Sequence, residues 1–176
     1  YIPPRRSAPL GDPAQVHEVI EALLKAKNPV IVAGQGILYA QAWQELRHLA
    51  ELVQLPVMTT MNGKGAFPED HALALGAGGH SYPRTVSHFL DKADLVLGIG
   101  TSFTRSSFVT PIPPGKVMGQ ITIDEGDISK DYSISTGVIG DARAVLQQMI
   151  EGVQAQTGSS GRTGEDVVIR EVRAVR

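Results

Sequence analysis

Short apolar runs alternate with amphipathic helical patterns along most of this chain, and this alternation limits the fold more than any other feature. The runs cover residues 30–33, 56–60, 73–76, 95–100, 120–124 and 137–140, and the first of them is apolar throughout. Continuous apolar runs are typical of strands buried on both faces of a parallel sheet. The sequence therefore predicts an α/β fold with a doubly wound, six-stranded parallel sheet and helices on both faces.

Helix signals lie between the predicted strands. The first helix is expected to be capped by Asp12, which precedes Pro13, and to bury one stripe formed by Val16, Val19, Ile20, Leu23 and Leu24. A second helix is expected to direct Trp43, Leu46 and Leu49 inward, a third follows residues 81–83, and Asp141 is expected to cap the last one.

The ends of the chain differ from its middle in composition. Residues 1–11 contain three prolines and are predicted to be an extended N-terminal linker, because the residue before a proline avoids helical geometry. Residues 12–153 form the predicted domain, residues 154–164 a flexible linker rich in Gly and Ser, and residues 165–176 the start of a further helix or of the next domain. Because the chain begins with Tyr1, we expect a fragment of a longer protein.

Composition excludes several classes of function. Sixteen Lys and Arg balance eighteen Asp and Glu, so the sequence predicts neither nucleic-acid binding nor attachment to a membrane surface. The absence of cysteine excludes disulfides and a cysteine nucleophile, and the five histidines show no metal-ligand spacing. No nucleophile-elbow motif and no carboxylate pair spaced for acid–base work is present, so no catalytic residue is predicted.

Glycine-rich segments follow several predicted strands, among them Gly34-Gln35-Gly36 and Gly98-Ile99-Gly100. In a parallel sheet the carboxyl ends of the strands form the ligand crevice, and glycine lets backbone amides approach a diphosphate. Tyr39 stands where a dinucleotide fingerprint would have its third glycine. Two interpretations stay open: a nucleotide site, present or ancestral, and tight turns alone.

Charged residues near these segments are equally open to two interpretations. Asp124 follows the fifth strand and could bind a ribose or tie its own loop, whereas Asp141 is better explained as a helix cap. Arg105 and Lys64 could contact phosphate, although a single basic residue in a loop is more often solvated. An NAD-binding domain of the same fold is disfavoured, because Glu51, near the expected position of its ribose-binding acid, lies within a helix.

Six short motifs, each of low specificity by itself, follow one another along the chain at residues 28–36, 55–60, 63–65, 93–100, 123–124 and 140–142. In this order they resemble the central domain of thiamine diphosphate-dependent decarboxylases and carboligases, such as acetolactate synthase, benzoylformate decarboxylase and benzaldehyde lyase. The resemblance covers residues 12–153 and implies a Rossmann-like domain between two others.

The resemblance implies the central domain of an acetolactate synthase-like carboligase or 2-keto acid decarboxylase, a lyase or transferase that is inactive as an isolated fragment. Thiamine diphosphate and Mg²⁺ would be held by the flanking N- and C-terminal domains of a cytoplasmic homodimer or homotetramer. The alternative from another class is a free-standing nucleotide-binding or regulatory module of the same fold.

In several members of this family the central domain binds FAD or ADP. Transferred to this chain, the resemblance implies cofactor contacts at Gly34, Gly36, Thr59, Thr60, Gly100, Thr101 and Arg105, with Asp124 at the ribose and Asp141 and Ala142 beside adenine. Nucleotide-binding members carry an arginine two residues after the glycine that closes the fourth strand, where this chain has Ser102. Because a charge-assisted phosphate contact is missing, FAD or ADP is expected to bind weakly or not at all.

Overall fold

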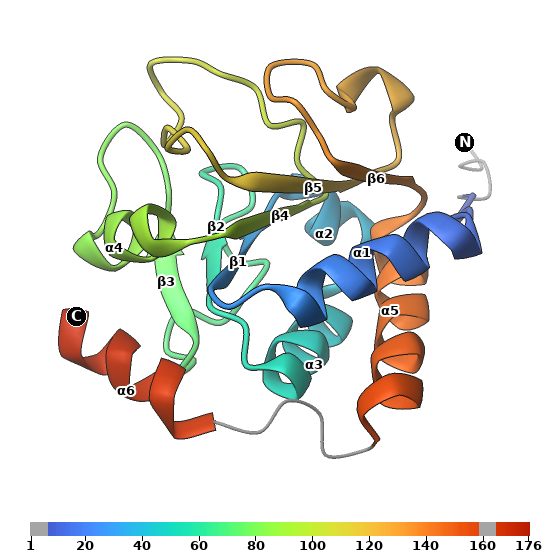
Figure 1. Ribbon diagram of the computed structural model, residues 1–176. Helices are drawn as coiled ribbons and strands as arrows, with labels where there is room; N and C mark the ends of the chain where they lie inside the picture. The colour runs from blue at the N-terminus through green and yellow to red at the C-terminus, as the bar shows by residue number, and fades with distance from the viewer. Residues whose placement is uncertain (1–6, 159–164) are drawn as a thin grey trace, which may run out of the picture.

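The computed structural model describes residues 7–158 and 165–176, and its sheet has six parallel strands within that part of the chain (Figure 1). The strand order is β3-β2-β1-β4-β5-β6, which is the Rossmann order. The strands are β1 (Pro29–Ala33), β2 (Val57–Thr59), β3 (Ala74–Ala77), β4 (Leu95–Ile99), β5 (Val117–Thr122) and β6 (Thr136–Ile139). The predicted six-stranded parallel sheet is therefore confirmed, and its order reverses between β1 and β4.

The two central strands explain why their sequences are apolar throughout. Every residue of β1 and β4 is buried, and the two strands pair in register from Pro29 and Leu95 to Ala33 and Ile99. Ile31 and Leu97 belong to the core on one face of the sheet, whereas Val30 and Val96 belong to the core on the other. A polar residue at any of these positions would lose its hydration without a partner.

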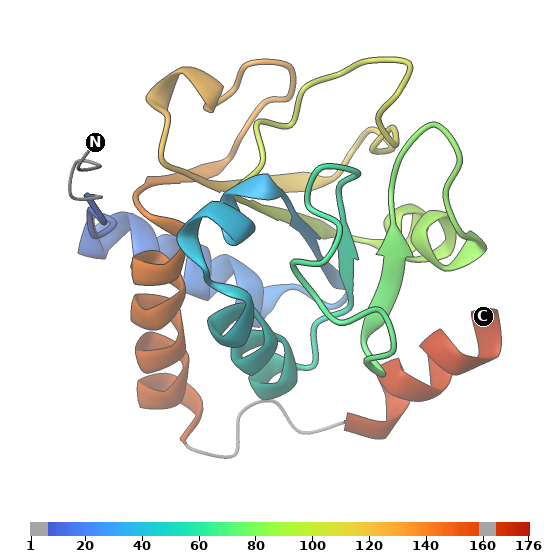
Figure 2. The same ribbon diagram turned by 180° about the vertical axis from the view of Figure 1, so that it is seen from behind.

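Four helices cover the first face of the sheet: α1 (Pro13–Lys25), α2 (Gln35–Ala40), α3 (Trp43–Val53) and α5 (Ala142–Thr157). Figure 2 shows α3 and α5 in front of the strands. Asp12 caps α1 as predicted, because its Oδ1 accepts hydrogen bonds from the amides of Ala14 and Gln15 at 2.9 and 3.1 Å. Val19 and Leu23 of this helix are buried, also as predicted.

The second face is covered differently. Helix α4 (Arg84–Lys92) packs over one side of it, and the loops at residues 100–116 and 123–135 cover the side nearer to β5 and β6 (Figure 1). The second loop contains one short 3₁₀ helix, η1 (Glu125–Asp127). Phe103, Ile112 and Tyr132 from these loops pack on the core beside Met118 of β5. On this face of the sheet, loops therefore cover part of the apolar core that helices cover on the other face.

The C-terminal helix α6 (Glu165–Val175) lies beside α4 and the edge strand β3 in both views (Figures 1 and 2). Val172 is completely buried there, and Arg176 Nη2 donates to the carbonyl oxygens of His71 and Ala74 at 2.9 and 2.8 Å. Glu171 accepts hydrogen bonds from the side chain of Lys92, which holds the pKa of this carboxyl below its usual range. The helix thus covers the outer edge of the sheet.

Three local expectations are corrected by the structure. Trp43 begins α3 with 42% of its surface exposed, so its predicted inward orientation is wrong, although Leu46 and Leu49 are buried. The short helix α2 was not predicted; it ends at Gln41, whose φ of 54° turns the chain into α3. Strand β5 begins at Val117, three residues earlier than predicted. None of the helices in the described ranges is long and apolar enough to cross a membrane.

Candidate functional site

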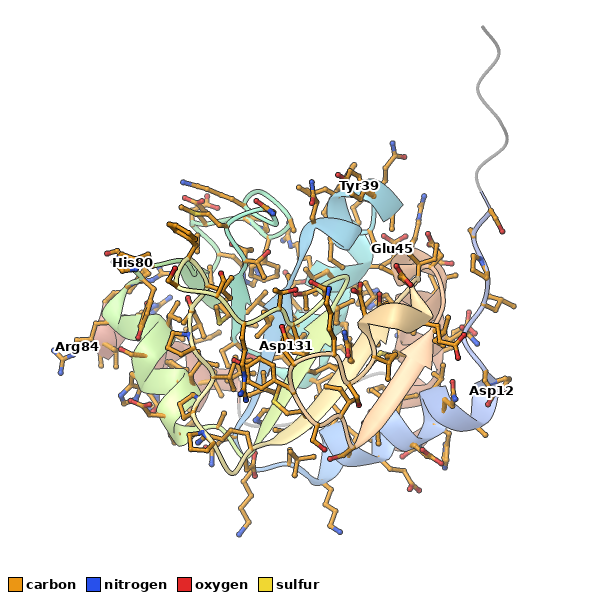
Figure 3. The ribbon with its side chains drawn as sticks, turned by 90° about the horizontal axis from the view of Figure 1, so that it is seen from above. Asp12, Tyr39, Glu45, His80, Arg84 and Asp131 are labelled. Carbon is orange, nitrogen blue, oxygen red and sulfur yellow. The ribbon has the colours of Figure 1, made fainter. Side chains whose placement is uncertain are left out.

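A crevice of about 650 Å³ lies at the carboxyl ends of the strands, on both sides of the point where the strand order reverses. Its walls come from the turn after β1 and from the segments that follow all five other strands. Figure 3 shows Tyr39 on α2, His80 in the segment after β3 and Asp131 in the loop before β6. In open parallel sheets this is the place where ligands bind.

The two central glycine turns are joined to each other at the floor of the crevice. Gly34 N donates to Ile99 O at 2.9 Å, and Gly36 N donates to Gly100 O at 2.9 Å. A Cβ atom at Gly36 would lie 2.6 Å from the Cα atom of Gly100, so no larger residue fits there. These contacts favour the tight-turn interpretation, because they use amides that a diphosphate would need.

Seven of the ten residues implied by the resemblance line this crevice: Gly36, Thr60, Gly100, Thr101, Asp124, Asp141 and Ala142. The other three lie outside the lining. Thr59 is a buried residue of β2, with 6% of its surface exposed, and Gly34 packs against the backbone of Gly100. Arg105 lines a neighbouring pocket, where its guanidinium carbon lies 4.2 Å from the centre of the Tyr132 ring.

Two aspartates of the crevice, Asp124 and Asp141, act as caps. Asp141 Oδ1 accepts hydrogen bonds from the amides of Arg143 and Ala144 at 3.0 and 3.2 Å, which begins α5. Asp124 Oδ1 accepts from Gly126 N at 2.9 Å and begins the 3₁₀ helix η1. The predicted cap at Asp141 is therefore confirmed, and the loop tie at Asp124 is the one observed.

Residues 102–105, where nucleotide-binding members carry their arginine, form hydrogen bonds within the protein. Ser102 Oγ lies 2.9 Å from Thr104 Oγ1, and the backbone amide of Arg105 donates to Asp131 at 2.7 Å.

Lys64, the other candidate phosphate contact, pairs with Glu69 at 3.5 Å. His80 Nδ1 lies 2.9 Å from Ser107 O. Each of these groups is thus engaged with a partner in the chain.

Two residues that sequence reasoning missed shape the crevice. The ring of Phe103 lies directly against Gly98 of β4, and its backbone adopts a φ of 49°, which is strained for an aromatic residue. Gln120 is completely buried in β5, and its Nε2 donates to the carbonyl oxygens of Thr101 and Asp127 at 3.1 and 3.0 Å. Two sequence signals could have revealed these contacts: Gly98 inside the buried strand β4, and the side-chain amide of Gln120 inside the buried strand β5.

The charges along the crevice are of one sign. Asp124, Asp127 and Asp141 are among its lining residues, and neither lysine nor arginine is found in the described lining. Nor do the described residues contain a group of three or more His, Cys, Asp or Glu that could hold a metal ion. The crevice is therefore acidic on one side, and its remaining walls are polar or apolar.

The strand order and the crevice at the reversal point define a domain of the Rossmann type. Residues 16–149 match the family described as thiamine pyrophosphate enzyme, central domain. The chain is 34% identical over 156 residues to the probable acetolactate synthase large subunit of Methanocaldococcus jannaschii, covering 88% of this chain and 26% of that protein. The acetolactate synthase large subunit of Corynebacterium glutamicum is 33% identical over 144 residues, with coverages of 80% and 23%.

Among solved structures, benzoylformate decarboxylase from Polynucleobacter necessarius has a TM-score of 0.74 at 22% identity, with 96% of this chain and 32% of that chain covered. The likeness to this structure supports the fold. The chain belongs to the family of central domains of thiamine pyrophosphate enzymes, and it spans about a quarter of the length of the acetolactate synthases that it matches.

Proposed function

We propose that this chain serves as the central, non-catalytic domain of an acetolactate synthase-like carboligase or 2-keto acid decarboxylase. The observation that carries the proposal is the family match over residues 16–149, in a chain that spans about a quarter of its acetolactate synthase relatives. The crevice adds support, because its described lining consists mainly of glycine, hydroxyl and apolar side chains. Such a lining suits binding or support better than proton transfer.

Thiamine diphosphate is the cofactor of this family, and we place it and Mg²⁺ in the flanking domains of the whole enzyme. This placement agrees with the described residues, which contain no group of three or more His, Cys, Asp or Glu that could hold a metal ion. In this proposal the whole enzyme is a cytoplasmic homodimer or homotetramer, and the domain positions its two neighbours.

An activity assay tests the proposal. The purified chain would be incubated with thiamine diphosphate, Mg²⁺ and either pyruvate or benzoylformate, with the whole large subunit of Corynebacterium glutamicum as a positive control for pyruvate. We expect no acetolactate, acetaldehyde or benzaldehyde from the chain alone. Product formed by the chain at a rate above that of cofactor in buffer would contradict the proposal.

We further propose that ADP and FAD bind this crevice weakly, with dissociation constants in the high micromolar range or above. A diphosphate does not fit the residues present: the amide of Gly36 is used by Gly100, and Ser102 is tied to Thr104. Losing one charge-assisted contact costs about 1.5 to 3 kcal/mol, or one to two decades of affinity. The same contacts disfavour the alternative of a free-standing nucleotide-binding module.

Calorimetric titration with ADP and FAD tests this second part. If either ligand binds, we expect its ribose at Asp124 and its adenine near Asp141 and Ala142, so Asp124→Ala would weaken binding. Submicromolar affinity for FAD, or a protein that is yellow when purified, would contradict weak binding. ADP binding that is unchanged by Asp124→Ala would contradict the assigned position of the ribose.

A further inference from the structure

The acidic side of the crevice is built by the loop after β5. Asp124 is exposed at its start, and Asp127 is half-buried three residues later, with its Oδ2 within 3.4 Å of Thr122 Oγ1. The nearby cations point to other partners: Arg143 Nε donates to Glu45 at 2.7 Å, and Arg105 lies over Tyr132. An anion placed beside Asp124 and Asp127 would therefore meet like charge.

Aromatic and apolar side chains also line the crevice, among them Tyr132 from the same loop. Phe103 lies against Gly98, and its ring packs edge to face against Tyr132 with a centroid distance of 5.9 Å. At the mouth, three large side chains lie mostly in solvent, with exposed fractions of 64% for Tyr39, 64% for Met61 and 77% for Phe108. Exposed apolar groups gathered at one cavity mark a binding surface more often than chance exposure does.

We propose that this crevice binds a flat aromatic organic cation, with its positive group beside Asp124 and Asp127, and that it selects against diphosphates. The ring would lie against the exposed aromatic side chains at the mouth, Tyr39 and Phe108, where flat groups stack well. The positive group would gain from the two carboxylates. The proposal rests on the crevice being the ligand site of this domain, and it is independent of where the enzyme carries out its reaction.

Three probes with one ring system and different charges test the sign of this selection. They are 5′-amino-5′-deoxyadenosine, a cation at neutral pH, then uncharged adenosine, and then anionic ADP, each titrated calorimetrically into the wild-type chain. We expect the amine to bind about tenfold more tightly than adenosine, and ADP at least about threefold more weakly, at low ionic strength. The difference between amine and ADP should shrink in 0.3 M salt, because salt screens exposed charges.

Conservative variants locate the source of the selection. Asp127→Asn and Asp124→Asn each keep the size of the side chain and remove one negative charge, so each should lower the preference for the amine over adenosine about threefold. Glu151→Gln on the exposed surface of α5 removes the same charge far from the crevice lining and should leave the preference unchanged. Thermal melts confirm that each variant is folded.

Several results would overturn the inference. ADP binding as tightly as the amine, no heat from the amine at millimolar concentration, or a preference that survives both aspartate variants would each do so. Failure here is distinguishable from failure of the proposed domain role, because that role is tested by product formation from the isolated chain. A chain that forms no product yet binds ADP more tightly than the amine would retain its role and refute this inference alone.

Discussion

Replacing Gly36 with alanine tests the close contact between the two central turns. The added Cβ would lie 2.6 Å from the Cα atom of Gly100 and 3.0 Å from its carbonyl oxygen, whereas carbon atoms normally approach to about 3.5 to 4.0 Å. The turns after β1 and β4 must therefore separate by about 1 Å, which weakens the hydrogen bond from Gly36 N to Gly100 O. Overpacking of about 1 to 3 kcal/mol and a lost hydrogen bond of about 1 kcal/mol predict a loss of about 2 to 4 kcal/mol.

Gly79→Ala is the matched control, because the nearest atom to its new Cβ is the flexible Cε of Met61 at an ordinary 3.6 Å. We expect this variant to stay within about 0.5 kcal/mol of the wild type. Urea unfolding followed by far-UV circular dichroism measures both, and Gly36→Ala should also lower Tm by roughly 5 to 12 °C. If the two variants unfold at the same urea concentration, the close approach of the turns is not what fixes glycine at position 36.

Three further predictions concern carboxylates. Asp141→Ala removes the cap of α5 and should cost about 1 kcal/mol in a urea melt, whereas Asp141→Asn should keep most of it. Burial raises the pKa of Asp94, but backbone amides, including those of Lys27 and Asn28, outweigh it and hold the pKa below its usual range. The stabilisation that ionised Asp94 gives the fold is therefore present above the unfolded-state pKa and is lost as the pH falls through the folded-state pKa. Asp94→Asn should lower the free energy of unfolding by about 1 to 2 kcal/mol at pH 7 and weaken its decrease at acidic pH. The hydrogen bond from Lys92 likewise lowers the pKa of Glu171, so acidification should lower the protection factors of the α6 amides, that is, raise their exchange rates relative to an unstructured peptide at the same pH. Glu171→Gln should abolish that dependence.

The sheet could be predicted from sequence because its central strands are buried on both faces. Burial on both sides leaves a continuous apolar run such as residues 30–33, and the chain marks the starts of α1 and α5 with an aspartate, at Asp12 and Asp141. These signals are local, so they can be read without knowing which strands are neighbours. The family resemblance drew on the same local motifs.

The crevice could be predicted only in outline. Glycine turns indicated where it lies, but the contact of Gly36 with Gly100 depends on two strands that are more than sixty residues apart. The same holds for the ring of Phe103 over Gly98, which a strained backbone places there. Trp43 was misplaced because it is the first residue of α3, directly after the turn that ends α2, and no periodic pattern announces a six-residue helix. Distances between remote segments are properties of the fold rather than of any motif.

Loops over the second face have a consequence for how such domains diverge over generations. The loops at residues 100–116 and 123–135 supply much of the crevice lining, whereas the helices of the first face mainly support the sheet. Phe103, Ile112 and Tyr132 of these loops also pack on the core, but substitutions at exposed lining positions such as Phe108 and Asp124 can change the ligand without disturbing it. As such domains diverge, the strands therefore keep their common sequence pattern, whereas the loops change with the ligand.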